Sequence, residues 1–144
     1  MPEITITRDI DAPQADVWAL VANPSRFADW NTLHTRWVTP PPDALAVGMV
    51  ITEVVTIKGV VDTITFTTEE LTPPRQVGLS GSGSTGSTVS LVFTVEELPD
   101  GRSTVSLYIK FESPLLFGPL NKVIERAFRK QLEASLQRLS SAFE

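Results

Sequence analysis

Residues 113–144 read SPLLFGPLNKVIERAFRKQLEASLQRLSSAFE, and this segment is the strongest indication of the fold in the sequence. At about 100° per residue, its apolar side chains gather on one side of a helix and most of its charged side chains lie opposite. The apolar side comprises Leu120, Val123, Ile124, Ala127 and Phe128, continued by Leu132, Leu136, Leu139 and Phe143. The charged side comprises Lys122, Arg126, Arg129, Lys130 and Glu133. An apolar stripe of this length needs a partner surface, so we expect the preceding strands to form the sheet that receives it.

Most of the chain before this helix has the patterns of strands. The alternation of Ile4, Ile6 and Ile10 with polar residues predicts a first strand. High β-branched content predicts five more strands, at residues 49–57, 60–68, 76–80, 88–97 and 102–111. The joints between these five are short turns or, at residues 81–86, a glycine-rich hairpin, and they suit an antiparallel meander.

Two short helices are expected between the first strand and the meander. Pro13 suits a first helical turn, and apolar residues at helical spacing follow to about Ala22. The pair Asn23-Pro24 ends this helix, and a second helical turn is expected to begin at a serine cap, Ser25. Residues 31–47, which include three consecutive prolines, are expected to form a long irregular connection beside the functional site.

This order of elements predicts an α+β fold in which a curved antiparallel sheet wraps around a long C-terminal helix. The two short helices follow strand one, and residues 1–144 are expected to form a single domain, since the chain shows neither an internal repeat nor a linker. A twisted sheet and one straight helix can part at one end. We therefore expect an apolar cavity between them.

Composition removes several classes of function. The chain of 144 residues has no cysteine, which excludes disulfides, thiolate metal sites and a cysteine nucleophile. A net charge of -5 argues against nucleic acid as a partner. No run of about 18 apolar residues and no signal-peptide pattern is present, so we expect a cytoplasmic protein without membrane insertion. The single histidine argues against a metal site, and no cofactor is expected.

Two segments near the start carry a family resemblance. Residues 10–24, IDAPQADVWALVANP, and residues 27–30, FADW, resemble the opening of the START/Bet v 1-like (SRPBCC) superfamily, and the polyketide cyclase/dehydrase-like bacterial branch fits best. The strand order and closing helix are similar to the helix-grip fold of that superfamily. The resemblance implies binding of a lipid, a polyketide or another small hydrophobic or amphipathic molecule in the cavity, with catalysis in some members. It transfers no uniform set of catalytic residues.

A narrower resemblance adds a different class of function. Trp30 with His34, the pair Lys58-Gly59, and residues 113–119 are similar to a mycobacterial toxin of a type II toxin–antitoxin pair. This similarity implies growth inhibition and a small antitoxin-like partner protein. A ligand-binding protein, a toxin and a polyketide cyclase-like enzyme therefore stand as alternatives, and the sequence leaves catalysis, and the choice between monomer and homodimer, open.

Candidate ligand contacts are large apolar or amphipathic side chains on elements expected around the cavity. They are Phe27, Trp30, Leu33, His34, Trp37, Phe66, Phe93, Tyr108, Phe111, Phe117, Val123 and Phe128.

His34 is also the best single candidate for catalysis, because histidine as a residue type serves as a general base near neutral pH. Its alternative role is a loop histidine that hydrogen-bonds its neighbours. Glu53 and Asp62 lie in a predicted hairpin and would suit acid–base work if they faced inward, but exposed positions explain strand carboxylates more simply.

Overall fold

The computed structural model describes residues 3–114 and 119–144. Its elements in chain order are β1 (Glu3–Ile10), α1 (Gln14–Val21), the 3-10 turn η1 (Pro24–Arg26), α2 (Phe27–Trp30), β2 (His34–Trp37), β3 (Val50–Ile57), β4 (Val60–Thr72), β5 (Gln76–Gly83), β6 (Thr88–Glu97), β7 (Ser103–Glu112) and α3 (Pro119–Ser141). Within the described residues the strands form one seven-stranded sheet in the order β1-β7-β6-β5-β4-β3-β2, and all neighbouring strands are antiparallel.

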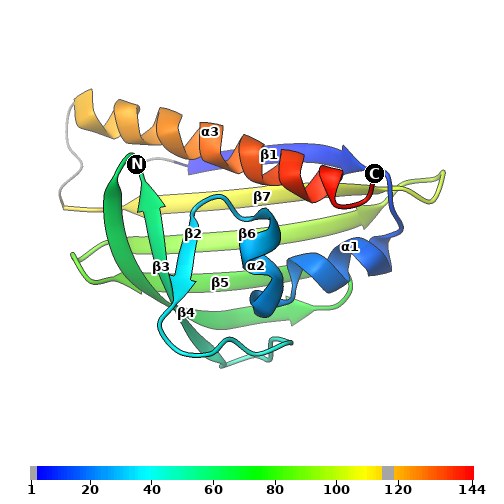
Figure 1. Ribbon diagram of the computed structural model, residues 1–144, viewed down its shortest axis with the longest axis horizontal. Coiled ribbons are helices and arrows are strands. Elements are labelled where there is room, and N and C mark those ends of the chain that lie inside the picture. Colours follow the sequence, from blue (N-terminus) through cyan, green and yellow to red (C-terminus); the bar gives the residue numbers. More distant parts are fainter. Residues whose placement is uncertain (1–2, 115–118) are drawn as a thin grey trace.

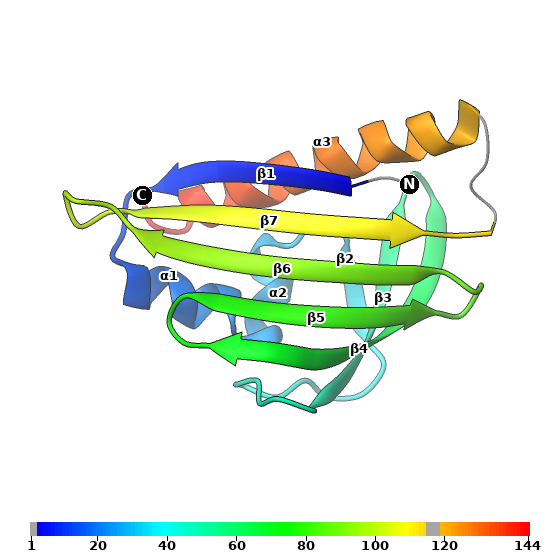
Figure 2. The ribbon, with the colours of Figure 1, turned by 180° about the vertical axis from the view of Figure 1, so that it is seen from behind.

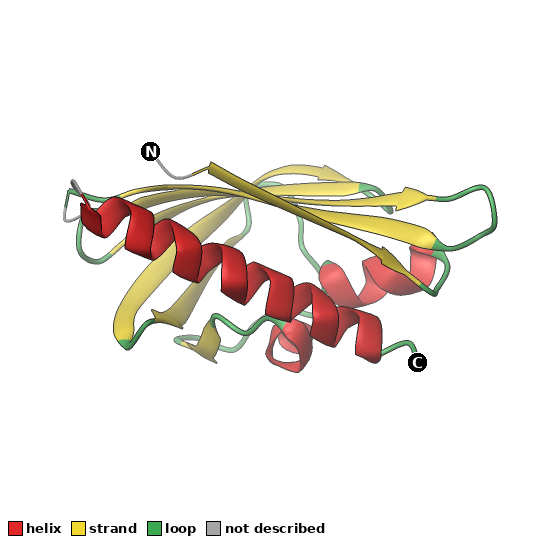
Figure 3. Cartoon of the chain, turned by 90° about the horizontal axis from the view of Figure 1, so that it is seen from above, coloured by secondary structure: helices red, strands yellow, loops and turns green. Residues whose placement is uncertain are grey.

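All the described helices lie on one side of this sheet. Figure 1 shows α3 running along β1 and β7, and α1 and α2 lie on the side of its C-terminal half, with α2 in contact with α3. Seen from above, the sheet curves over α3 and the two short helices (Figure 3). The opposite face of the sheet is free of helices in the part of the chain that the structure describes (Figure 2). The predicted arrangement, a curved antiparallel sheet around a long C-terminal helix, is confirmed.

The concave face of the sheet carries the hydrophobic core. On the central strands Phe93 of β6 lies opposite Leu107 of β7, and Val95 lies opposite Val105, with all four side chains buried. Residues between them on the same strand, such as Ser106, point to the outer face because side chains alternate along a strand. Burying each large apolar side chain contributes about 1.5–3 kcal/mol. This face therefore holds the sheet to the helices.

Helix α3 covers the core with the stripe expected from its sequence. Its buried residues are Ile124, Ala127, Phe128, Leu132, Ser135, Leu136 and Leu139. The basic residues Lys122, Arg126, Arg129 and Lys130 are exposed, as predicted. The helix packs against β1 and α2. A hydrogen bond of 3.0 Å from the Thr32 backbone N–H to Ser135 Oγ ties the segment after α2 to α3.

The sequence prediction missed strand β2. Residues 34–37 lie inside the segment expected to be irregular, but they pair with β3 at the edge of the sheet, with a register shift between His34 and Arg36. A four-residue edge strand pairs on one side and has too few residues for a clear alternation, so its sequence carries little signal. Strands β4 and β5 also extend further than predicted, to Thr72 and Gly83.

The cap of the second helical segment also differs from the prediction. The capping side chain is Asn23, whose Oδ1 accepts a hydrogen bond from the backbone N–H of Ser25 at 3.0 Å. Asparagine caps a helix at least as well as serine does, and the proline that follows suits the first position after the cap. The helical path therefore starts at Pro24 as a 3-10 turn and continues as α2 from Phe27.

Candidate functional site

A cavity of about 270 Å³ lies between the concave face of the sheet and α3. Strands β3, β4, β6 and β7 form its roof and walls, α3 closes one side, and the segment around α2 contributes Trp30 and Leu33. Most of the lining is apolar. The expectation that the sheet and the helix part at one end agrees with this position, because the cavity follows α3 from Leu120 only as far as Ser135.

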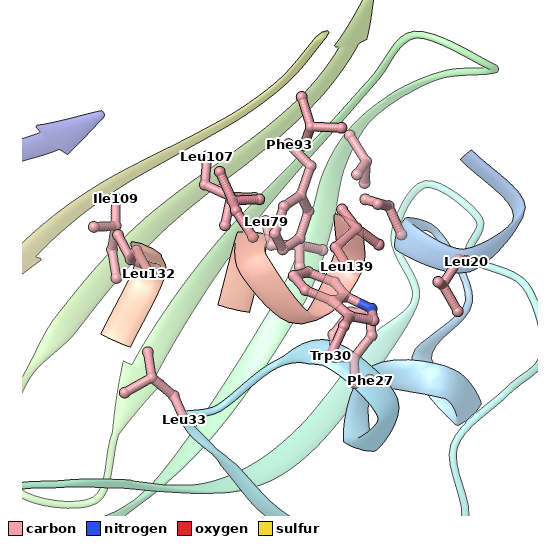
Figure 4. Packing of buried hydrophobic residues seen from close by; sticks show 14 of the residues in the cluster. Leu20, Phe27, Trp30, Leu33, Leu79, Phe93, Leu107, Ile109, Leu132 and Leu139 are labelled. Carbon is pink, nitrogen blue, oxygen red and sulfur yellow. The ribbon is translucent and has the colours of Figure 1, made fainter. Parts of the chain in front are cut away.

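The two ends of the cavity differ in packing. At the closed end Trp30 and Phe93 meet edge to face, with ring centroids 5.6 Å apart. Figure 4 shows them packed together, whereas Leu33, Ile109 and Leu132 lie apart from this group. At the other end Val60, in the β3–β4 hairpin, is 58% exposed and Leu120 is 46% exposed, although both line the cavity. Apolar lining residues open to solvent mark the mouth of the cavity at this end.

Several of the predicted ligand contacts do line the cavity. They are Trp30, Leu33, Phe66, Phe93, Phe111 and Phe128. They come from β4, β6, β7, α3 and the α2 segment, so the fold brings together residues that are as far apart in the sequence as Trp30 and Phe128.

Other predicted contacts pack behind the cavity wall. Phe27 contacts both Trp30 and Trp37, at centroid separations of 5.7 Å and 5.6 Å. The imidazole of His34 lies 5.0 Å from the ring of Trp37. Phe27, His34 and Trp37 are not cavity-lining residues in this structure. Their position is that of a second layer, which supports the lining residues from behind.

The structure places two predicted contacts away from the cavity. Tyr108 lies on the outer face of β7, where its hydroxyl donates a hydrogen bond to Glu3 Oε1 at 2.6 Å. Its neighbours Leu107 and Ile109 occupy the inner face because alternate side chains point to opposite sides. Val123 is exposed on α3, one position before the buried Ile124. Phe117 lies outside the described residues.

The sequence also suggested that Leu120, Val123, Ile124, Ala127 and Phe128 on the closing helix could form one wall of the cavity, and of these Leu120, Ile124 and Phe128 line it. The list of candidate ligand contacts nevertheless omitted many smaller lining residues because it selected mainly aromatic side chains. The apolar ones are Val55, Ile57, Val60, Val61, Ile64, Val89, Leu91, Leu107, Ile109, Leu120, Ile124 and Leu132. Strand alternation was the available signal, since most of these residues lie on the apolar face of their strand.

A buried histidine–carboxylate pair borders the cavity. The Nδ1 atom of His34 lies 2.5 Å from Oε2 of Glu53, and the two side chains are 4% and 3% exposed. The residues meet because β2 and β3 are hydrogen-bonded neighbours with Trp37 opposite Glu53, and the register shift in β2 turns His34 toward the same carboxylate. Glu53 itself lines the cavity. The interpretation of Glu53 as an exposed strand carboxylate is therefore wrong.

Burial raises the pKa of the Glu53 carboxyl above its ordinary value, and the hydrogen bond and positive charge of His34 oppose this rise only in part. Removing a carboxylate from water destabilises its charged form, which is why burial acts in this direction. A carboxyl group with a raised pKa that reaches an apolar cavity can accept hydrogen bonds and exchange protons with a bound molecule. Glu53, with His34 behind it, is therefore a buried polar group on the wall of the cavity.

Asp62 is a second carboxylate at the cavity, but it has different partners. Its Oδ1 accepts hydrogen bonds from the backbone N–H and the hydroxyl of Ser84, at 3.0 Å and 2.7 Å, and its Oδ2 accepts from Ser87 Oγ at 2.9 Å. Partial burial acts to raise the pKa of Asp62, but these hydrogen bonds outweigh burial and hold the pKa below its ordinary value. Asp62 therefore fastens the β5–β6 turn to β4 and does not share a partner with Glu53.

Neither a metal-binding cluster nor a membrane-spanning helix is present among the described residues. Among residues 3–114 and 119–144, no three histidine, aspartate or glutamate side chains lie close enough together to hold a metal ion. In the same residues, no helix has both the length and the apolar character needed to cross a membrane.

The raised pKa of Glu53 predicts a specific dependence of stability on pH. From about pH 4.5 upward the folded state retains a proton that the unfolded state has lost, so the free energy of unfolding should fall as the pH rises toward the folded-state pKa. Glu53→Gln should remove this fall. We would measure urea unfolding of both proteins between pH 4 and pH 8.

The same comparison in a His34→Asn background serves as the control, because that background contains no histidine. Any remaining difference in pH dependence then comes from Glu53. Parallel stability curves for His34→Asn and the double variant would contradict the assignment of a raised pKa to this carboxyl.

Comparisons with known proteins agree with this architecture. The family model described as "Polyketide cyclase / dehydrase and lipid transport" matches residues 1–144. A protein named Toxin Rv0910 and an uncharacterized protein, Rv1546, both of Mycobacterium tuberculosis, are 29% and 27% identical over 143 residues, 99% of either chain in each case. The solved structure of a START superfamily protein from Mycobacterium smegmatis has a TM-score of 0.79 at 14% identity, covering 99% of both chains. Because the family model matches residues 1–144, the chain belongs to the polyketide cyclase/dehydrase and lipid transport family.

Proposed function

We propose that this protein binds a small apolar or amphipathic molecule in the cavity between the sheet and α3. The observation that carries the proposal is the cavity itself, which is lined mainly by apolar side chains and opens at the β3–β4 hairpin. Pockets of this kind are the usual sites for small ligands in proteins. The family description, which includes lipid transport, supports the same class of ligand.

The volume of the cavity limits the size of the ligand. An engineered apolar cavity of about 150 Å³ holds one benzene molecule. A cavity of about 270 Å³ therefore suits a group nearly twice as large, such as two fused aromatic rings or a comparable length of alkyl chain. A longer ligand would leave its remainder at the mouth, where Val60, Val61 and Leu120 offer exposed apolar surface.

A cavity-filling variant tests this proposal. Leu91 lies on the concave face of β6 and is only half-buried because it borders the cavity. Leu91→Trp should place an indole in the cavity and weaken binding of 2-methylnaphthalene at least tenfold. With ligand at about 100 times the dissociation constant, the wild type should gain about 2.7 kcal/mol of stability, and the variant should gain much less.

Val92→Trp is the matched control. Val92 is the next residue on the same strand, lies on the outer face and does not line the cavity. It should leave both binding and ligand-induced stabilisation unchanged. Equal weakening by both substitutions, or no stabilisation of the wild type by any apolar probe, would count against binding in this cavity.

Growth inhibition is a second candidate, and the relative named as a toxin is the observation that favours it. Expression in a bacterial host with and without induction tests it. Growth arrest by the wild type and by Val92→Trp, but not by Leu91→Trp, would link toxicity to the cavity. Normal growth on expression of the folded protein would leave ligand binding as the proposal.

A further inference from the structure

We propose that Glu53 selects ligands that carry a hydrogen-bond donor, such as a hydroxyl group, and disfavours ligands that carry a carboxylate. This inference rests on the proposed function, because it assigns a chemical role to one residue of the same cavity. It starts from the position of Glu53, which is 3% exposed and lines a mainly apolar cavity.

The two oxygens of the Glu53 carboxyl have different surroundings. Oε2 lies 2.5 Å from His34 Nδ1, whereas Oε1 accepts no hydrogen bond from any residue of the described chain. Because Oε2 is occupied, Oε1 is the oxygen available to a molecule in the cavity. Oε1 is not among the described side-chain atoms that are fully buried without a partner, which fits an oxygen exposed to the cavity. A ligand that supplies a donor there gains a hydrogen bond in an apolar environment, where such a bond is stronger than in water.

Oε1 remains an acceptor for either position of the shared proton. With the shared proton on His34 Nδ1 and none on Glu53, Glu53 is a carboxylate, Oε2 accepts from Nδ1–H and Oε1 keeps its lone pairs free. With the proton on Oε2, Glu53 is a neutral acid and Oε1 is its carbonyl oxygen. In both cases the cavity presents an acceptor. The complementary group on the ligand is therefore a donor, and a ligand carboxylate would place two acceptors against each other.

Trp30 Nε1, a buried donor on another lining residue, has no partner among the described residues, but the side-chain oxygens of three other lining residues are already bonded within the protein. Oδ1 of Asn31 accepts a hydrogen bond from the backbone N–H of Leu33 at 3.0 Å. Oγ of Ser135 accepts one from the backbone N–H of Thr32 at 3.0 Å. The oxygens of Asp62 are bonded to the β5–β6 turn. Glu53 Oε1 therefore differs from these oxygens in being both deeply buried and free to accept.

Three probes built on one naphthalene frame test the inference. They are 2-naphthol, which carries a donor, 2-methylnaphthalene, which carries none, and 2-naphthoate, which carries an anion. Dissociation constants are measured by titration calorimetry for the wild type and for Glu53→Leu. The preference is the ratio of the dissociation constant of 2-methylnaphthalene to that of 2-naphthol. We expect this ratio to fall about 10- to 100-fold in the variant, because a hydrogen bond to a charged group usually contributes an effect of this size. Comparing ratios cancels the different hydration of the two probes.

A control and a measurement without substitution complete the design. Glu69 is an exposed carboxylate of β4 that accepts a hydrogen bond from Ser80, so Glu69→Leu should leave the ratio unchanged. If Glu53→Leu does not fold, the carboxyl ¹³C signal of Glu53 in the labelled wild type gives the answer. It should move on addition of 2-naphthol and stay in place on addition of 2-methylnaphthalene.

The outcomes separate this inference from the proposed function. If 2-methylnaphthalene binds and the ratio is equal in the wild type and Glu53→Leu, the cavity is a binding site but Glu53 only joins β3 to β2, and the inference is overturned. Binding of 2-naphthoate as tight as that of 2-naphthol overturns it as well. If no probe binds, the proposed function fails together with the inference.

Discussion

Replacing Phe93 with alanine is expected to lower the free energy of unfolding by about 3–5 kcal/mol. Phe93 is 2% exposed on the concave face of β6, and its ring packs edge to face against Trp30 and Phe27, with centroids 5.6 Å and 6.3 Å away. Each such aromatic contact adds about 0.5–1.5 kcal/mol beyond the burial of area. The variant loses these contacts and enlarges a cavity that α3 and the sheet cannot collapse to fill.

Urea unfolding measures this loss, and an unchanged slope against denaturant would show that the unfolding transition is the same. Val92→Ala is the control, since Val92 adjoins Phe93 on the same strand but lies on the outer face. We expect it to cost less than half as much. A loss below about 1.5 kcal/mol for Phe93→Ala would contradict the aromatic packing at the closed end of the cavity.

The second large effect is expected in α3, where Leu136→Ala should cost about 2–5 kcal/mol. Leu136 is 1% exposed and lies in the half of the helix that packs on the core beyond the cavity. Truncation there creates a new void instead of extending an existing one. Because Leu136 does not line the cavity, affinity for 2-methylnaphthalene should stay unchanged in the folded variant.

Gln137→Ala is the matched control on the same helix. Gln137 is exposed, and alanine is the better helix former, so its effect should lie within about 0.5 kcal/mol. Chemical denaturation gives both stabilities. Equal losses of stability in the two variants would contradict the packing of this half of α3 against the core. A loss of ligand affinity in Leu136→Ala would show that the shape of the cavity depends on helix residues that do not line it.

Periodicity in the sequence was sufficient to predict the main architecture. Strands β6 and β7 and helix α3 are long enough for their apolar residues to repeat several times, at a period of two in the strands and near 3.6 in the helix. Repetition makes the pattern specific. Strand β2 has only four residues, too few for a clear apolar repeat. It forms because it pairs with the edge of β3, and its own sequence carries little indication of a strand.

The candidate site was predicted less completely than the fold. Aromatic side chains such as Trp30 and Phe93 were identified by their size, but size does not say which face of a strand a residue occupies. Tyr108 illustrates this point, because its place between Leu107 and Ile109 already assigned it to the outer face. Glu53 was weighed as an inward carboxylate and set aside, since carboxylates are rarely buried.

Local spacing and residue types in contiguous segments are enough to predict the order of the helices and of the strands other than β2, the basic outer side of α3 and the family resemblance. Three features emerge from the folded chain alone: the place where the sheet leaves α3 to form the cavity, the residues that line this cavity, and the contact of Glu53 with His34 across the β2–β3 pair. These features depend on sheet curvature and on strand register, including a register shift in β2. Both arise from contacts between segments that are distant in the chain, and no local pattern records them.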